Sequence, residues 1–316
     1  MWISLIAILS LRSYSIFMTD DLNPKPVSLA KQTREWLRQY ELHAKKGLGQ
    51  HFLINSGILK NIISAADLSP RDLVIEVGPG LGVLTRELIQ NAGYVISVEL
   101  DSAVIDLLQT NLSQYDNFSL IHSDILKIRP EEIIEREKDK FPASVDTQRY
   151  KVVANLPYYI TQPIIRHFCE AAVKPETMVI MVQKEVARNI IAKPGDLSIL
   201  AVSVQIYGNP RIMGYVPAGN FYPPPKVDSA ILRIDLYPQP AVSVTSIDNF
   251  FRVVKAGFSS ARKQIVNSLA QGLEVTKPEV ISLLDKAGVS PQKRPEMLTL
   301  EEWAQLEKYF KREENK

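Results

Sequence analysis

The tetrapeptide Asn155-Leu156-Pro157-Tyr158 combines groups that could activate an aromatic amine. An exocyclic amine on adenine is a poor nucleophile because its lone pair is delocalised into the ring. The Asn155 side-chain oxygen and the Leu156 main-chain carbonyl could accept its two protons and favour a pyramidal nitrogen. Pro157 fixes the backbone and has no competing N–H. Tyr158 offers a flat face on which an extruded base stacks, a contact worth about 1–3 kcal/mol.

A second aromatic element begins at Phe221, in the segment Phe221-Tyr222-Pro223-Pro224-Pro225-Lys226-Val227-Asp228-Ser229. The proline run favours a rigid, extended loop. We expect Phe221 to clamp the face of the base opposite Tyr158. The alternatives are a proline-rich ligand for an SH3-type domain or a plain connector.

The glycine-rich segment Glu76-Val77-Gly78-Pro79-Gly80-Leu81-Gly82 directly follows a predicted strand and precedes a predicted helix. Glycines at such a turn let a ligand approach the backbone closely. A dinucleotide fingerprint needs its third glycine three residues after the second, where this chain has Val83. The spacing therefore disfavours a nicotinamide cofactor and suits S-adenosylmethionine; a plain strand–helix turn is the alternative. A methyl sulfonium is already reactive, so neither a metal nor a dedicated base is required.

Two acidic residues follow the next two predicted strands. Glu99 lies twenty-one positions after Gly78, where a carboxylate accepts hydrogen bonds from both ribose hydroxyls. Asp124 is placed to bind the amino group of the cofactor's adenine, with a helix cap as the alternative. The glycine loop and the acidic residues together therefore predict a nucleoside-binding site.

Alternating strands and helices must position these motifs. Short apolar runs at 73–77, 94–98, 118–121, 151–154 and 178–182 predict strands, separated by helical patterns, and 212–216 and 230–236 predict a closing pair. This order predicts an α/β fold with a Rossmann-like methyltransferase sheet and a ligand at the strands' carboxyl ends. Residues 127–149 are charged and aperiodic, and we expect a surface insertion without chemistry.

The length of 316 residues suggests about two domains. We expect a Rossmann-like domain over 31–240 and a small all-α domain over 241–316. Residues 1–30 are expected to be disordered, or to include residues that are not translated because Met18 is the true initiator. The apolar run at 2–11 is shorter than the roughly 20 residues of a membrane span, and no clear secretory signal follows it. We therefore expect a cytoplasmic protein without membrane contact.

Cysteine, histidine and charge content narrow the chemistry further. The single cysteine, Cys169, excludes an intrachain disulfide and a cysteine-based zinc cluster, and the four histidines lack ligand spacing. The net charge is only +2, but residues 25–60 hold seven Lys or Arg against two Glu. A basic arm ahead of such a motif indicates nucleic-acid binding, although a solvated helix face would look the same.

Together these motifs resemble the ribosomal RNA adenine N6-dimethyltransferase family (KsgA/RsmA in bacteria) from about Lys45 to the C-terminus. The likeness extends to Gly49-Gln50-His51-Phe52-Leu53, Gln183-Lys184-Glu185-Val186 and Phe258-Ser259-Ser260-Ala261-Arg262-Lys263. It implies that S-adenosylmethionine is the cofactor and that its ligands are His51, Leu53, Gly78, Glu99, Asp124 and Asn155. His51 stands where many relatives have Asn, so its contact is expected to run through the backbone. Ala261 departs from the Arg-Arg-Lys often found there.

The resemblance also implies the substrate, two adjacent adenosines near the 3′ end of 16S rRNA within a pre-30S particle. We expect a monomer with no obligate protein partner. The basic candidates for contacts with the RNA backbone are Lys45, Lys46, Arg252, Lys255, Arg262 and Lys263.

Three other functions remain open. Erm-type enzymes, which act on 23S rRNA, tend to Asn-Ile-Pro-Tyr where this chain has Leu156. DNA adenine-N6 methyltransferases usually carry Asp-Pro-Pro-Tyr and a target-recognition insertion. A non-catalytic RNA-binding assembly factor would not need intact Asn155, Tyr158 and Glu99.

Overall fold

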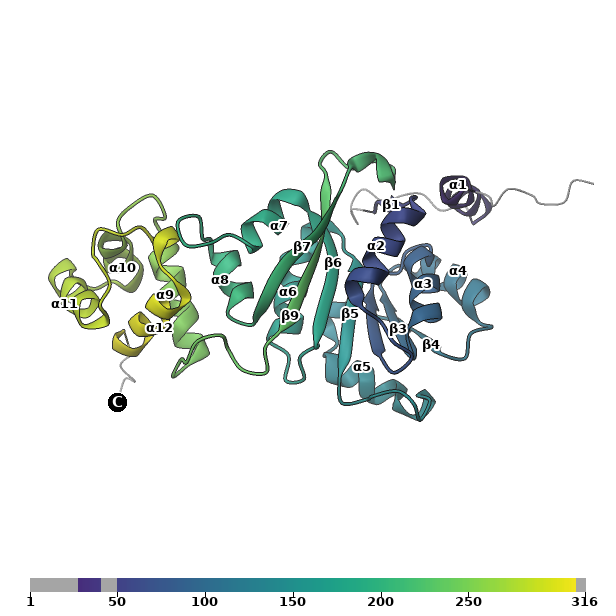
Figure 1. Ribbon diagram of the computed structural model, residues 1–316, viewed down its shortest axis with the longest axis horizontal. Helices are drawn as coiled ribbons and strands as arrows, with labels where there is room; N and C mark the ends of the chain where they lie inside the picture. Colours follow the sequence, from purple (N-terminus) through teal and green to yellow (C-terminus); the bar gives the residue numbers. More distant parts are fainter. Residues whose placement is uncertain (1–27, 41–49, 311–316) are drawn as a thin grey trace, which may run out of the picture.

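A computed structural model describes residues 28–40 and 50–310 of the chain. Its centre is a seven-stranded sheet (Figure 1). The strands of this sheet are β2 (Leu73–Val77), β3 (Tyr94–Glu99), β4 (Phe118–His122), β5 (Tyr150–Asn155), β6 (Thr177–Gln183), β7 (Gly208–Val216) and β9 (Ser229–Leu236). The helices before and between them are α1 (Leu29–Gln39), α2 (Ser56–Ala66), α3 (Val83–Asn91), α4 (Ser102–Leu112), α5 (Pro130–Glu137), α6 (Thr161–Cys169), α7 (Lys184–Ile190) and α8 (Ile199–Gln205).

The strand order is β4-β3-β2-β5-β6-β9-β7. Strands β2 to β6 run parallel, and β9 pairs antiparallel with both β6 and β7. From β2 the chain first extends the sheet through β3 and β4, and then returns to add β5 on the other side of β2. A ligand-binding crevice forms at the carboxyl ends of strands where the order reverses in this way.

Both faces of the sheet are buried at its central strands. In β2, Leu73 and Ile75 pack into one hydrophobic cluster, whereas the intervening Val74 packs into another. Side chains alternate between the two faces of a strand, so an unbroken apolar run is the pattern of a strand covered on both sides. Strand β2 is therefore buried at every position, because helices cover both faces of the sheet there.

A two-stranded ribbon lies apart from the main sheet. Strand β1 (Phe52–Leu53) pairs antiparallel with β8 (Phe221–Tyr222), and Leu53 lies opposite Phe221. Just outside the ribbon, the Ile54 N–H donates to the Asn220 carbonyl (2.9 Å). The ribbon brings the segment before α2 beside the proline-rich segment, although about 170 residues separate them.

After β9 the chain forms only helices, α9 (Ile247–Phe258), α10 (Ile265–Leu273), α11 (Lys277–Ala287) and α12 (Leu300–Tyr309). They gather at one end of the molecule, beyond α8 (Figure 1). Trp303 of α12 is fully buried, and its ring stacks on that of Phe258 at 5.6 Å. The predicted fold, a Rossmann-like sheet followed by a small all-α region, is confirmed. The boundary at residue 240 stays a prediction, and residues 1–27 lie outside the described part.

The segment 127–149 is more than the surface insertion that the sequence suggested. It contains α5, where Ile133 is completely buried and Glu137 accepts a hydrogen bond from the Ser119 hydroxyl of β4 (2.5 Å). The expectation of an irregular segment was wrong, because too few apolar residues show helical spacing here to reveal the helix. A proline at the first helical position followed by two glutamates was the available signal. The expectation that the segment carries no chemistry stays a prediction.

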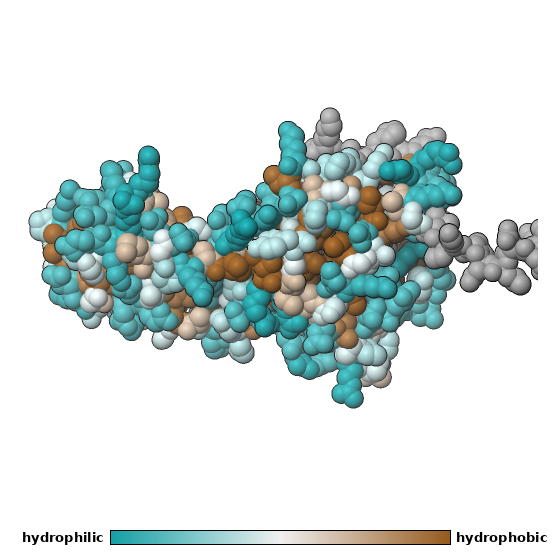
Figure 2. Space-filling model, turned by 45° about the horizontal axis from the view of Figure 1, so that its top comes forward, coloured by the Kyte–Doolittle hydropathy of each residue, from teal (hydrophilic) through white to brown (hydrophobic). Residues whose placement is uncertain are grey.

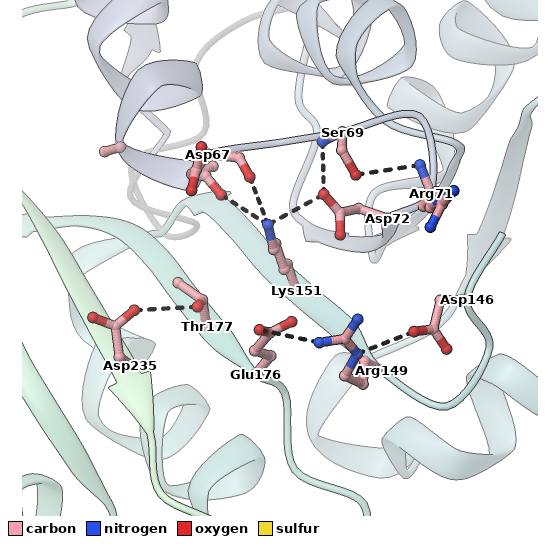
Figure 3. Close-up of polar contacts among 12 residues, drawn as sticks. Asp67, Ser69, Arg71, Asp72, Asp146, Arg149, Lys151, Glu176, Thr177 and Asp235 are labelled. Atoms are coloured by element: carbon pink, nitrogen blue, oxygen red, sulfur yellow. Dashed lines mark hydrogen bonds and ion pairs between the residues drawn. The ribbon is translucent and has the colours of Figure 1, made fainter.

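Two cations hold the C-terminal end of α2 at the amino end of the sheet. Lys151 of β5 donates to the carbonyl of Ala66 (3.3 Å). It also donates to the carbonyl of Asp67 (2.6 Å) and pairs with Asp72 (3.1 Å), as Figure 3 shows. Arg233 of β9 donates to the Ala65 carbonyl (2.7 Å). Cations satisfy the free carbonyls at a helix C-terminus. These contacts fix the C-terminal end of α2. Strand β1 directly precedes the N-terminal end of the same helix.

Most of the visible surface in Figure 2 is hydrophilic, and its hydrophobic patches gather over the middle of the molecule. Large exposed hydrophobic side chains include Ile199, Met213 and Tyr215. Within residues 28–40 and 50–310, no helix is long and apolar enough to cross a membrane.

Candidate active site

A cavity opens at the carboxyl ends of the parallel strands, at the crevice that the topology predicts. Each residue predicted to bind the cofactor lines this one cavity, namely His51, Leu53, Gly78, Glu99, Asp124 and Asn155. Leu156, Pro157 and Tyr158 line it as well. Residues from β1, β2, β3 and β5 and from the segment directly after β4 therefore meet here, although they span more than a hundred positions of the sequence.

The loop between β2 and α3 passes through left-handed backbone conformations. Gly78, Gly80 and Gly82 have φ of +67°, +54° and +75°. At Gly82 a Cβ atom would also lie 2.7 Å from the Leu108 side chain. Only glycine adopts these angles at little cost. The glycine spacing thus bends the chain sharply enough to expose its backbone to the cavity.

The Glu99 carboxylate is held at the wall of the cavity. One oxygen accepts hydrogen bonds from the N–H groups of Leu100 (2.7 Å) and Asp101 (2.8 Å), and the other from that of Gly80 (3.4 Å). Burial raises the pKa of Glu99, while these three bonds lower it. The bonds fix the direction of a carboxylate that keeps free lone pairs for ribose hydroxyls.

Glu76, which was not predicted as a site residue, lies beneath the glycine loop and lines the same cavity. One of its oxygens accepts from the hydroxyls of Thr85 (2.7 Å) and Ser97 (2.6 Å). Burial raises the pKa of Glu76 to about 7, the two hydroxyls lower it, and the charge of Glu99 raises it. The acidic first position of the glycine motif was the available sequence signal.

Asp124 caps a short helix, which is one of the two alternatives that the sequence left open, and it also lies at the cavity, where its role as a cofactor ligand stays a prediction. One carboxylate oxygen accepts from the Leu126 N–H (3.1 Å) and so caps the short helix that follows β4. The residue also lines the cavity. A cap of this kind leaves the second carboxylate oxygen able to accept a further hydrogen bond.

The Asn155 amide is oriented by the backbone of the residue directly before β1. Its NH2 group donates to the main-chain carbonyl of His51 (3.2 Å). A carbonyl only accepts, so the NH2 must face His51 and the amide oxygen must point elsewhere. The Asn155 oxygen is therefore available as an acceptor, as activation of an amine requires.

The Tyr158 ring is held from two sides. Its hydroxyl lies 2.7 Å from that of Ser229 in β9, and its ring stacks with the His51 imidazole at 5.7 Å between centroids. Burial raises the pKa of the Tyr158 phenol, and the Ser229 bond lowers it. Tyr158 therefore stays a neutral aromatic surface at physiological pH.

Phe221 lies outside the cavity lining in this conformation. The side chain is only 2% exposed and packs in the core behind β1, whereas the adjacent Tyr222 is 37% exposed. Neighbouring residues of a strand point in opposite directions, so the β1–β8 pairing turns Phe221 inward. Its role as the second stacking wall stays a prediction, and here its ring supports β1.

The predicted RNA-binding residues differ in placement. Lys255, Arg262 and Lys263 are exposed. Arg252 is half-buried and donates to Asn249 (3.0 Å) and to the Phe310 carbonyl, so it also joins α9 to the end of α12. Lys45 and Lys46 lie outside the described residues.

The groups that line the cavity match the chemistry of S-adenosylmethionine. Glu99 and Asp124 supply acceptors for hydroxyl and amino groups, and the loop from Gly78 to Gly82 supplies backbone to approach. Apolar side chains such as Leu53, Val77 and Ile125 complete the walls. In the described part of the chain, no three His, Cys, Asp or Glu side chains gather as a metal site would need.

The sequence comparisons agree with this geometry. The family described as "Ribosomal RNA adenine dimethylase" matches residues 41–312. A protein of Dehalococcoides mccartyi (strain CBDB1) named "Ribosomal RNA small subunit methyltransferase A" is 53% identical over 281 residues, which cover 88% of this chain and 92% of that protein. A protein of the same name from Alkaliphilus oremlandii is 41% identical over 283 residues, covering 89% and 96%.

Two solved structures resemble the whole fold. A dimethyladenosine transferase from Plasmodium falciparum has a TM-score of 0.66 at 26% identity and covers 81% of this chain and 96% of its own. The 23S rRNA methyltransferase ErmE has a TM-score of 0.62 at 29% identity, covering 82% and 98%. Since the family match spans most of the sequence and the cavity unites its motifs, the chain belongs to the ribosomal RNA adenine dimethylase family.

Proposed function

We propose that this chain transfers methyl groups from S-adenosylmethionine to N6 of two adjacent adenosines near the 3′ end of 16S rRNA, within a pre-30S particle. One observation carries the proposal. The Asn155 NH2 is occupied by the His51 carbonyl (3.2 Å), which leaves the amide oxygen able to accept a hydrogen bond, and Tyr158 lines the same cavity. An acceptor beside a stacking surface is what an extruded adenine needs.

Some residues of the cavity would bind the cofactor, and others would bind and activate the adenine amine. Glu99 and Asp124 would bind the hydroxyl and amino groups of the cofactor, and the bound cofactor supplies a methyl group on a cationic sulfur. Asn155 and the Leu156 carbonyl would accept the two protons of the adenine amine, which localises the nitrogen lone pair. The target base would stack on the ring of Tyr158. Positioning of this kind accounts for large rate effects without a metal or a strong base.

The relatives support the small subunit as the source of the RNA. Proteins 53% and 41% identical to this chain over most of its length are named small-subunit methyltransferases. Arg262 and Lys263 lie exposed at the turn after α9, where they could neutralise phosphates. Binding through such contacts weakens steeply as salt rises. We also propose that the chain acts as a cytoplasmic monomer without an obligate protein partner, which light scattering of the purified protein would test.

Tritiated methyl transfer tests the proposal with four substrates side by side. These are 30S subunits that lack the modification, naked 16S rRNA, 23S rRNA and duplex DNA. We expect label in the 30S sample at two adjacent adenosines, with N6,N6-dimethyladenosine as the product. Label chiefly in 23S rRNA or DNA would replace the proposal by an Erm-type or DNA enzyme. RNA binding without label in any sample would indicate an assembly factor.

A further inference from the structure

The side chain of His51 joins two parts of the active site. Its Nδ1 lies 2.7 Å from the main-chain carbonyl of Pro223, directly after β8. Its ring also stacks on Tyr158, with 5.7 Å between the centroids and 26° between the planes. The imidazole thus touches the proline-rich segment on one side and the catalytic tetrapeptide on the other.

The hydrogen bond defines which nitrogen of His51 carries the proton. The Pro223 carbonyl only accepts, so Nδ1 must be the donor and the neutral ring is the Nδ1–H tautomer. Pro223 itself has no N–H to offer. This imidazole bond therefore adds to the β1–β8 backbone pairing that holds the proline-rich segment.

The stacking geometry limits where a base can go. Two rings with a base between them lie about 7 Å apart, twice the rise of stacked base pairs. The His51 and Tyr158 centroids are 5.7 Å apart, so no base fits between them. An adenine that stacks on Tyr158 must use the ring face that His51 leaves uncovered. The Tyr158 hydroxyl is also hydrogen-bonded to Ser229, which fixes where the far end of the ring lies.

We propose that the imidazole of His51 is a positioning residue that covers one face of Tyr158 and ties the ring to the Pro223 segment, leaving a single face for the target base. The proposal rests on the proposed function and assigns the side chain a task beyond the backbone contact expected from the sequence. The His51 carbonyl, which orients Asn155, is common to every side-chain variant. Substitutions of the ring therefore test the imidazole separately from that contact.

Nitrogen-15 NMR of the histidine rings tests the bond without any RNA. At a pH where histidine is neutral, we expect His51 to show the Nδ1–H tautomer, which free histidine disfavours. Assignment comes from the spectrum of His51→Phe, in which one set of signals is lost. A His51 signal typical of the Nε2–H tautomer would overturn the proposed tie to Pro223, whether or not the chain methylates RNA.

Three variants separate the functions of the ring. His51→Phe keeps a flat ring but no donor, His51→Asn keeps a donor but no ring, and His51→Ala has neither. For His51→Ala we expect the single-turnover rate of RNA methylation to fall about tenfold or more, since misplaced reacting groups are costly. The other two variants should lie between this variant and the wild type. The Kd of S-adenosylmethionine should change by less than about twofold in all three.

His167→Asn is the matched control, because the His167 ring also contacts a main-chain carbonyl, that of Ile128 (3.1 Å), away from the cavity. We expect it to methylate at the wild-type rate. Equal rates for wild type and His51→Ala would overturn the positioning role. So would a loss in His51→Ala that is matched by a lower melting temperature and recovered on cooling, because that pattern indicates unfolding. If the wild type methylates no RNA, the proposed function is wrong. The NMR result would then still show whether His51 donates to the Pro223 carbonyl.

Discussion

The hydroxyl of Tyr158 lies 2.7 Å from the hydroxyl of Ser229, which links the segment Asn155-Leu156-Pro157-Tyr158 to strand β9. Ser229 is fully buried and ends the proline-rich segment. The bond joins residues 71 positions apart and holds the Tyr158 ring by the edge opposite its backbone. The position of the Tyr158 ring therefore depends on a strand that contributes no residue to the cavity lining.

We predict that Tyr158→Phe and Ser229→Ala lower RNA methylation by similar factors and that the double variant is little worse than either. Each single change breaks the same bond and leaves a buried partner group unsatisfied, at a cost of about 1–3 kcal/mol. Single-turnover rates in a double-mutant cycle measure the coupling. Additive losses would mean that the two hydroxyls act independently.

Asn155→Ala should abolish methyl transfer while S-adenosylmethionine still binds. The variant loses the amide oxygen that we propose accepts from the adenine amine, and we expect the rate to fall at least about a hundredfold, as for other lost transition-state contacts. Cofactor binding should weaken but stay measurable by calorimetry. Full activity in this variant would remove Asn155 from the assigned role.

Glu99→Gln should weaken cofactor binding and leave the rate at saturating cofactor nearly unchanged. The variant keeps the size of the side chain and loses the charge, and hydrogen bonds to charged groups contribute about 1.5–3 kcal/mol. We therefore expect the Kd of S-adenosylmethionine to rise by about tenfold to a hundredfold. Asp106→Asn, which changes an exposed carboxylate on α4, serves as the control. An unchanged Kd would exclude Glu99 from the ribose site.

The sequence allowed prediction of the cavity because its residues follow strand ends. Glu99, Asp124 and Asn155 each stand at or just after the carboxyl end of a parallel strand, and such ends meet at one edge of a sheet. Their neighbourhood follows from local patterns and topology alone. The glycine spacing also allowed prediction of the loop after β2, because positive φ angles at these positions favour glycine.

The directions of side chains and their long-range partners were harder to predict from the sequence. Phe221 and Tyr222 form a strand of only two residues, too short for an alternating pattern to reveal which one points inward. The partner of Tyr158, Ser229, lies 71 residues away, so only the folded sheet brings them together. His51 was expected to act through its backbone, and nothing local indicated that its ring meets Pro223 and Tyr158.

Glu76 makes the stability of the fold depend on pH. Burial raises its pKa to about 7 from an ordinary 4.5, so between these values the folded chain holds a proton that the unfolded chain has released. Stability from this group is therefore complete below pH 4.5 and is lost as the pH rises through 7. Each pKa unit corresponds to about 1.4 kcal/mol, which gives a loss of roughly 2 kcal/mol between pH 5 and pH 8.

Glu76→Gln removes this titration while keeping a side chain of the same size beside Thr85 and Ser97. We predict that its free energy of unfolding rises relative to wild type by roughly 2 kcal/mol between pH 5 and pH 8. Urea denaturation at both pH values measures the difference, and Asp106→Asn should follow the wild type. A constant gap between Glu76→Gln and wild type would show that the Glu76 carboxyl does not titrate in this range, because the other groups of the chain are the same in both proteins.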